Sequence, residues 1–153
     1  MTDTLPATTA RVPQSTAEDV NQRIYDDIRT RVTAYAAEGS QTIERRLREL
    51  DREWDIERTL EANAAAISLI GLGLGTFLHR RWYILPTLVA TFLLQHAVQG
   101  WCPPVPVFRR YGVRTATEID YERYALKALR GDFAPLCDSS TATPDAALAA
   151  VTR

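Results

Sequence analysis

Two apolar runs joined by a short basic turn constrain this chain more than any other feature. Residues 64–78 read AAAISLIGLGLGTFL and residues 82–101 read WYILPTLVATFLLQHAVQGW, with only HRR between them. A helix rises about 1.5 Å per residue, so roughly 20 apolar residues cross the roughly 30 Å hydrocarbon core of a bilayer. The second run reaches this length without Lys, Arg, Asp or Glu, and residues 60–63 can extend the first. The sequence therefore predicts a transmembrane helical hairpin over residues 61–101.

Aromatic residues mark both ends of the second run. Trp82 and Tyr83 open it and Trp101 closes it, as is typical of the interface between lipid and water. The alternative is a helical hairpin buried inside a soluble bundle. We prefer the membrane, because the rest of the chain offers little apolar material to surround such a hairpin. The lipid bilayer is therefore the first partner that we expect.

Basic residues predict the orientation of the hairpin. They are Arg45, Arg46, Arg48, Arg52 and Arg58 before it, and Arg109, Arg110, Arg114 and Arg123 after it. Cytoplasmic flanks carry an excess of such residues, so both termini are expected in the cytoplasm. The turn would then lie on the outer side, although it carries Arg80 and Arg81. The first 16 residues have no apolar central region, so we expect no signal peptide.

Composition argues against several classes of function. The formal net charge is −1 and arginines alternate with acids, which gives no nucleic-acid footprint. The two cysteines, Cys102 and Cys137, form no CxxC pair, and no His and Cys cluster suggests a metal. No Ser, His and Asp arrangement or phosphate loop is visible. We therefore expect no enzyme activity, no catalytic, cofactor or metal site and no nucleic-acid partner.

The remaining sequence predicts an all-α chain in which amphipathic cytoplasmic helices accompany the hairpin. The expected segments are a disordered N-terminus (1–16), a cytoplasmic helical extension (17–60), the hairpin (61–101), an interfacial segment and helix (102–133) and a flexible tail (134–153). Within them, residues 17–37 and 116–130 are expected to be helical. A helix from near Gln41 should continue into the first span, with at most a kink near Asn63.

A short apolar seam precedes the hairpin. It consists of Ile43, Leu47, Leu50 and Trp54, at spacings of four, three and four. Such spacing is typical of a coiled coil or of one face of a helical bundle. It is therefore a candidate cytoplasmic interaction surface. The surrounding charges, including Glu57, are interpreted as a solvated face.

Small residues form a stripe on the first span, namely Ala64, Ser68, Gly71 and Gly75. Glycines four residues apart allow another backbone to approach closely. The partner is either the second span or another copy of the chain. The alternative is that the glycines merely tolerate lipid.

Polar residues form a stripe on the second span, namely Thr87, Thr91, Gln95, His96 and Gln99. A polar stripe is costly in lipid, so it should face protein or a hydrated path. The simpler interpretation is that these residues form interhelical hydrogen bonds. The more specific alternative is that they line a conduit for a small solute. His96 could ligate haem or a metal, but a neutral histidine bonded to Gln or backbone is the simpler explanation.

Cys102 follows the second span and precedes two prolines. It is the candidate reactive thiol, because nearby Arg109 and Arg110 would favour its thiolate. The alternative is a small residue that fits a tight exit from the membrane.

The stretch QGWCPPVPVFRRYGVRTATEID resembles the YgaP-like inner-membrane domain family. The matching residues are Gly100, Trp101, Cys102 and Pro103, followed by Gly112 and Thr115. The resemblance covers roughly residues 41–133. It implies a multi-pass, often dimeric hairpin in the bacterial inner membrane. The rhodanese domain found in some members is lacking here, so sulfur-transferase activity does not carry over.

Three functions are consistent with this sequence. The first is a non-enzymatic structural or accessory subunit that forms a homo-oligomer or joins a larger membrane complex. The second is sulfur handling or small-solute passage through the hairpin, with Cys102 as the reactive thiol. The third is a membrane tether that recruits a soluble partner through the seam from Ile43 to Trp54.

Overall fold

The computed structural model describes residues 6–136 and 143–152, and within these ranges the chain is all-α and contains no strand. The expected fold class is therefore confirmed at the level of secondary structure. The helix α4 (Ile56–Phe77) is long and apolar enough to cross a membrane, judged by length and composition. It is the one such helix in the described part of the chain.

The chain divides into two compact units, and each combines two stretches of sequence. The first unit comprises residues 1–24 and 54–116, and the second comprises residues 25–53 and 117–153. These divisions differ from the expected linear segments. The difference arises because the N-terminal residues pack with the hairpin and the helices on either side of the hairpin pack with each other.

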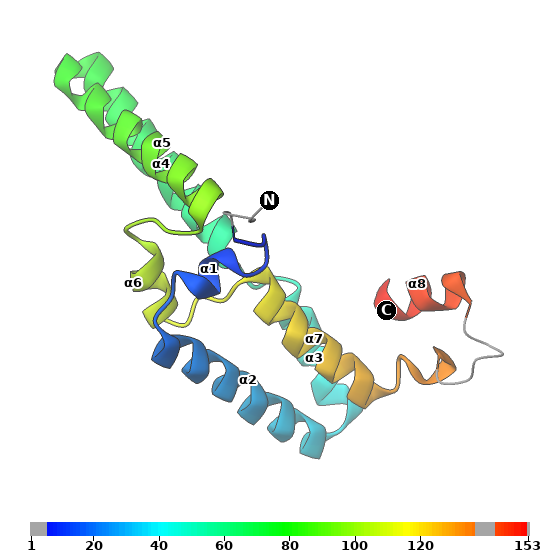
Figure 1. The fold of residues 1–153 in the computed structure, drawn as a ribbon. Helices are drawn as coiled ribbons and strands as arrows, with labels where there is room; N and C mark the ends of the chain where they lie inside the picture. Colours follow the sequence, from blue (N-terminus) through cyan, green and yellow to red (C-terminus); the bar gives the residue numbers. More distant parts are fainter. Residues whose placement is uncertain (1–5, 137–142, 153) are drawn as a thin grey trace, which may run out of the picture. The chain divides into compact units, whose positions relative to one another are not determined.

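In the first unit, α4 and α5 (Ile84–Gln99) run side by side as a hairpin (Figure 1). The 3-10 helix η1 (Arg80–Tyr83) joins them. The second apolar run therefore yields an α-helix of 16 residues, shorter than the expected span. The reason is that the first two residues of the run belong to the 3-10 turn, which the His79 side chain caps by accepting the Arg81 N–H. Gly100, with φ +78°, then ends the helix before the last two residues of the run.

The small face of α4 is turned toward α5 and η1. Ala64, Gly71 and Gly75 are buried, and Ser68 is half-buried. A Cβ added to Gly71 would lie 2.6 Å from Cδ of Pro86, and one added to Gly75 would lie 2.7 Å from the Tyr83 ring. The backbones thus approach as closely as glycine allows, and the partner of this face is the second helix of the same hairpin.

The expected continuous helix through residue 55 is wrong. Five residues, 51–55, separate the helix α3 (Ser40–Leu50) from the start of α4. The Asp55 side chain accepts the Arg58 backbone N–H, and the Ile56 N–H donates to the Arg114 carbonyl oxygen at 2.8 Å. These bonds start a new helix, because they satisfy backbone donors that a continuing helix would have bonded internally.

Residues near the N-terminus contribute to the first unit, although we expected no regular structure in residues 1–16. The short helix α1 (Arg11–Gln14) buries Val12. The first residues of α2 (Glu18–Glu38) follow it, and α6 (Val105–Arg110) lies beyond the hairpin. The fully buried Arg109 of α6 donates to Thr16 and Asn21 at 3.2 and 3.0 Å, which joins this N-terminal segment to α6.

The second unit is a helical cluster of α3, α7 (Ala116–Arg130) and the later part of α2. Its core contains Ile43, Leu47, Leu50, Ile119 and Leu126, with Val32 and Tyr35 packed against it. Three of the four seam residues are therefore buried inside the chain. The fourth, Trp54, belongs to the first unit and is 48% exposed.

A buried carboxylate also lies in the second unit. Glu122 is fully buried and pairs with Arg46 at 2.8 Å and with Arg31 at 3.5 Å. Arg46 additionally reaches Glu49 and Glu53. Burial acts to lower the pKa of Arg46, but the hydrogen bonds that Arg46 donates to Glu122 and the neighbouring negative charges outweigh it and raise the pKa above its ordinary value.

The last described helices also belong to the second unit. They are η2 (Ala134–Leu136) and α8 (Pro144–Thr152), where we expected a flexible tail. The Lys127 Nζ donates to the Val151 carbonyl oxygen at 2.6 Å, so α8 contacts α7. Cys137 lies outside the described residues.

Two glycines two positions apart provide a test of the hairpin packing. We expect Gly71→Ala to destabilise the protein by about 1–3 kcal/mol, because its Cβ would overlap the rigid Pro86 ring. Gly73 has no atom within 4 Å of an added Cβ, so Gly73→Ala should stabilise by up to about 1 kcal/mol through helix propensity. Thermal unfolding in mild detergent measures both. Equal shifts for the two variants would contradict this packing.

Candidate functional site at the base of the hairpin

Three charged or polar side chains meet where the hairpin begins and ends. Glu57, in the first turn of α4, accepts from Arg11 Nη2 at 2.8 Å through one carboxylate oxygen. Its other oxygen lies 2.8 Å from Nε2 of His96, near the end of α5. Because an ionised carboxylate only accepts hydrogen bonds, Nε2 of His96 is the donor. We call Arg11, Glu57 and His96 the basal cluster.

The basal cluster is shielded from water to different degrees. The His96 side chain is 5% exposed, whereas those of Arg11 and Glu57 are 21% and 35% exposed. His96 Nδ1 is buried and has no hydrogen-bond partner among the described residues. The position of Glu57 in the first turn of α4 also stabilises its negative charge, because that charge complements the positive end of the helix dipole. The cluster thus joins the two ends of the hairpin through one shared, partly desolvated carboxylate.

The basal cluster also ties the N-terminal segment to the hairpin. Arg11 Nη1 donates to the Ala97 carbonyl oxygen at 3.0 Å, which satisfies a free acceptor in the last turn of α5. Gly100 then ends α5 with φ +78°, and a Cβ there would lie 2.4 Å from the Arg11 carbonyl oxygen. The glycine that opens the Gly-Trp-Cys-Pro sequence is therefore required twice, for its backbone conformation and for the approach of α1.

An apolar layer adjoins these charges. Cys102 is 3% exposed and packs with Val12, Ile56, Leu60 and Val105. These residues come from α1, α4, α6 and the segment after α5, so the layer joins four parts of the first unit. In this setting Cys102 fills the role of a small apolar residue.

Burial raises the pKa of the Cys102 thiol above its ordinary value. The Val105 backbone N–H acts in the opposite direction, and the negative charge of Glu57 raises the pKa further. The Arg109 side chain that we expected to favour the thiolate instead donates to Thr16, Asn21 and the Val113 carbonyl oxygen. The geometry therefore gives little support to a reactive thiol at this position.

A cavity of about 300 Å³ lies between α4 and α5, close to this apolar layer. Leu60, Ile67 and Phe92 are among the residues that line it, and Cys102 contributes to its wall. Apart from Asn63 and the thiol, the lining side chains are apolar. Such a surface suits hydrocarbon, whereas a hydrated path for a polar solute needs convergent polar groups.

The predicted polar stripe on α5 does not act as a unit. His96 is buried in the basal cluster, Gln95 is half-buried, and Thr87, Thr91 and Gln99 are exposed. The Thr87 and Thr91 hydroxyls donate to the carbonyl oxygens four residues earlier in the same helix. These two threonines therefore need no partner from another helix, because their donors are already satisfied.

Sequence reasoning identified His96 but missed its partners. Glu57 was assigned to a solvated face and Arg11 to a disordered segment, although both contact the hairpin base. The sequence does hold one signal for the Glu57–His96 contact. The first turn of one helix lies beside the last turn of the next when the two helices are antiparallel, so an acid and a histidine at these positions can meet. No group of three or more His, Cys, Asp or Glu residues able to bind a metal occurs in the described ranges.

Removal of the shared carboxylate should loosen the N-terminal segment. We expect Glu57→Ala to destabilise the protein by about 1–3 kcal/mol, since Arg11 and His96 lose their common acceptor. Amides near Val12 should then exchange hydrogen faster. Glu61→Ala is the matched control, because Glu61 lies one turn further along α4, is exposed and has no bonded partner among the described residues. Faster exchange near Val12 in the control as well would show that the effect is not specific to the cluster.

The raised pKa of Cys102 predicts slow alkylation at neutral pH. A smaller thiolate fraction and a buried sulfur both reduce the rate, so native protein should react with iodoacetamide at least tenfold more slowly than denatured protein. The rate should rise with pH above the ordinary thiol range. Mass spectrometry of the Cys102 peptide measures this rate. Rapid alkylation of the native protein at pH 7 would instead support the reactive-thiol hypothesis.

Comparisons with known proteins identify no relative of this chain. No protein-family model, curated protein or solved structure matches the chain. The resemblance to the YgaP-like family thus stays an expectation based on the residues that follow α5.

Proposed function

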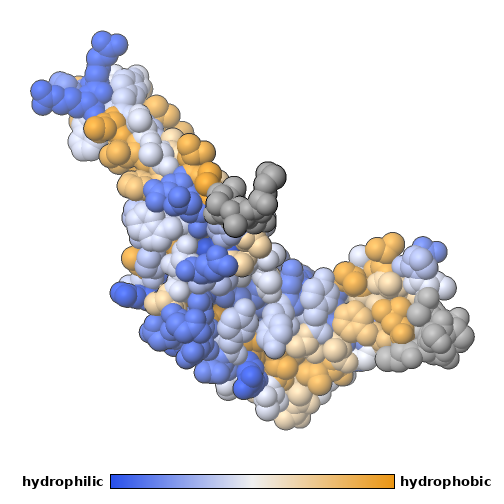
Figure 2. Space-filling view, in the orientation of Figure 1, coloured by the Kyte–Doolittle hydropathy of each residue, from blue (hydrophilic) through white to orange (hydrophobic). Residues whose placement is uncertain are grey.

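We propose that this chain is an integral membrane protein whose α4–η1–α5 hairpin enters the bilayer, and that it acts as a non-enzymatic structural or accessory subunit. The single observation behind this proposal is the apolar surface that the hairpin leaves uncovered. Leu69, Ile70, Phe77 and Leu94 are between 59% and 85% exposed. Figure 2 shows apolar side chains along the visible face of the hairpin and hydrophilic ones at its tip.

The lengths of the elements support the two-span arrangement. The 22 residues of α4 extend about 33 Å. The 16 residues of α5 extend about 24 Å, and the four residues of η1 add roughly 8 Å if they continue in the same direction. Both arms then approach the roughly 30 Å thickness of a hydrocarbon core.

Burial argues against a soluble core helix. Only 17% of the apolar stretch of α4 is buried in the chain. Helices at the core of a soluble protein bury most of such a stretch, and large exposed apolar patches are characteristic of membrane or protein contact. Lipid supplies the missing cover without any further chain. The threonines of α5 are compatible with lipid because their hydroxyls bond within the helix.

The proposed setting is the bacterial inner membrane, with both termini in the cytoplasm. Arginine excess on both flanks of the hairpin supports this orientation. A role in a homo-oligomer or a larger membrane complex requires faces other than the glycine face, which already contacts α5. One open groove, lined by residues that include Leu72, Thr87, Thr91 and Leu94, lies between the two arms.

The two other functions receive less support. Sulfur handling is disfavoured because Cys102 is buried with a raised pKa, and solute passage is disfavoured because the cavity between the arms is apolar. Recruitment of a partner through the seam would require exposed side chains, but Ile43, Leu47 and Leu50 are in the core of the second unit.

Extraction and labelling together test the anchor and its orientation. The full chain should stay in the membrane pellet after alkaline carbonate treatment. In a background with both native cysteines changed to Ser, Arg80→Cys should react with a membrane-impermeant maleimide in intact cells. Ala37→Cys, which is exposed at the end of α2, should react only after lysis.

Each outcome of this experiment is informative. Release into the alkaline wash would contradict the anchor. Retention in the pellet with labelling at position 37 and none at position 80 would keep the anchor and reverse the orientation. Labelling of both positions in intact cells would contradict a two-span hairpin, because it requires its ends and its turn on opposite sides.

A further inference from the structure

The two arms of the hairpin touch at two levels and enclose a cavity between these levels. Near the tip, Gly71 of α4 lies against Leu85 and Pro86. At the base, Glu57 is bonded to His96. Gly71 and Glu57 are about 21 Å apart along α4, since each helical residue rises about 1.5 Å. Side chains between the two contacts have to fill the intervening space, and the cavity of about 300 Å³ shows that they do not fill it.

This hairpin cavity has a buried floor and an exposed rim. Leu60, Ala64 and Cys102 line it and are buried. Ile67 and Phe92 also line it and are exposed. All of these residues belong to the first unit. The cavity therefore opens onto the outer surface of the hairpin itself.

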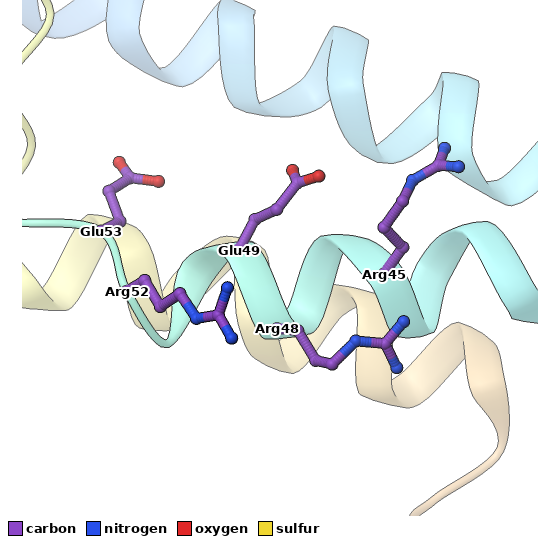
Figure 3. A pocket seen from close by; sticks show the side chains of 5 residues that line it. All are labelled: Arg45, Arg48, Glu49, Arg52 and Glu53. Carbon is purple, nitrogen blue, oxygen red and sulfur yellow. The ribbon is translucent and has the colours of Figure 1, made fainter.

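A groove beside α3, in the second unit, has the opposite chemical character. The side chains that line it are all charged, namely Arg45, Arg48, Glu49, Arg52 and Glu53 (Figure 3). Charges of both signs occur together there, and Arg48 also pairs with Glu44. That groove suits water. The described residues that line the hairpin cavity include no charged side chain, so the cavity suits an apolar occupant.

Water is a poor occupant of the hairpin cavity. A buried water needs about two to four polar partners, and the lining side chains offer only the Asn63 amide and the Cys102 thiol. The Asn63 amide nitrogen already donates to the Thr59 carbonyl oxygen at 2.8 Å. If the cavity stayed empty, its wall would lose dispersion contacts. Hydrocarbon restores these contacts without any hydrogen bond.

We propose that the hairpin cavity binds the hydrocarbon tail of a bilayer lipid. This inference rests on the proposed function, because it takes the hairpin to lie in the bilayer, where the exposed rim faces acyl chains. A flexible unbranched tail enters between Ile67 and Phe92 and reaches Ala64 on the floor. Its volume places the cavity at the small end of the range of ligand sites. Since no charged side chain lines the described wall, the headgroup stays outside and does not decide binding.

Two successive alanines of α4 allow a matched test. Ala64→Leu places a larger side chain on the cavity floor. Ala65→Leu is the control, because it adds the same side chain at a position that is exposed and does not line the cavity. Ile67→Trp is a second test variant, which narrows the mouth of the cavity. Because Ile67 is exposed, this variant leaves the buried packing of the hairpin intact.

Lipid retention is measured on the full chain by native mass spectrometry. A steroid-based detergent is used, so that no alkyl tail of the detergent takes the place of a lipid tail. The protein is mixed with phosphatidylglycerol or phosphatidylcholine carrying identical tails. The parent and Ala65→Leu should retain one lipid per chain, equally for both headgroups. Ala64→Leu and Ile67→Trp should bind each lipid at least roughly tenfold more weakly, because even two methylenes lose their apolar contact.

Thermal unfolding without lipid separates a filled cavity from a damaged fold. Ala64→Leu should unfold at the temperature of the parent or above it, because leucine fills empty volume. If Ala64→Leu unfolds at a lower temperature, the lipid retention of Ile67→Trp decides the question instead.

Other results would overturn the proposal. Equal lipid retention by Ala64→Leu, Ile67→Trp and the control is one. Retention of phosphatidylglycerol alone is another, because a headgroup would then decide binding. A lipid-free dimer of the parent that Ala64→Leu abolishes would assign the cavity to a second copy of the chain.

Alkaline carbonate extraction of the same proteins distinguishes this proposal from the membrane anchor. A parent chain that stays in the pellet, with equal lipid retention by all variants, would contradict the tail site and leave the anchor intact. Release of the parent chain into the wash would contradict both.

Discussion

The shared carboxylate of Glu57 is the contact on which the first unit depends. It joins Arg11 of α1 to His96 of α5, residues that are 85 positions apart in the sequence. Because Glu57 opens α4 and His96 lies near the end of α5, the same contact sets how the two arms meet at their base. The Arg11–Glu57 ion pair favours this arrangement of the chain because any other arrangement would leave a partly desolvated charge without its partner, which would be destabilising.

Close backbone contact holds the arms at a second level, nearer the tip. Gly71 and Gly75 bring α4 against Pro86 and Tyr83, so the arms need no large side chains between them there. This has a consequence for the outer surface. Bulky residues such as Leu69 and Phe77 point outward, and the chain itself has no means to cover them. The glycines and the exposed apolar surface are therefore two results of one arrangement, which lipid would complete.

Residues on opposite faces of α3 have separate roles. Ile43, Leu47 and Leu50 build the core of the second unit with α7, while the arginines of the outer face remain exposed. Arg46 lies between these faces and satisfies the buried Glu122. Arg46 also pairs with Glu49 and Glu53, so three carboxylates share one guanidinium.

The sequence by itself determined the helices with strong periodicity and stop signals, because those signals are local: the helix over residues 116–130 has the predicted bounds. It did not reveal α1 or α8, which lie where we expected no regular structure. It also determined that one face of the first apolar run would pack closely. Only the tertiary structure decided that this face meets α5 and that most of the seam is internal. It also decided where α4 starts, because the Ile56 N–H bonds to the distant Arg114 carbonyl oxygen while the Asp55 side chain caps the first turn. The basal cluster could not be predicted from the sequence either, because it depends on contacts between distant residues. Its members are separated by dozens of residues, and a charge looks solvated until the fold brings its partner to it.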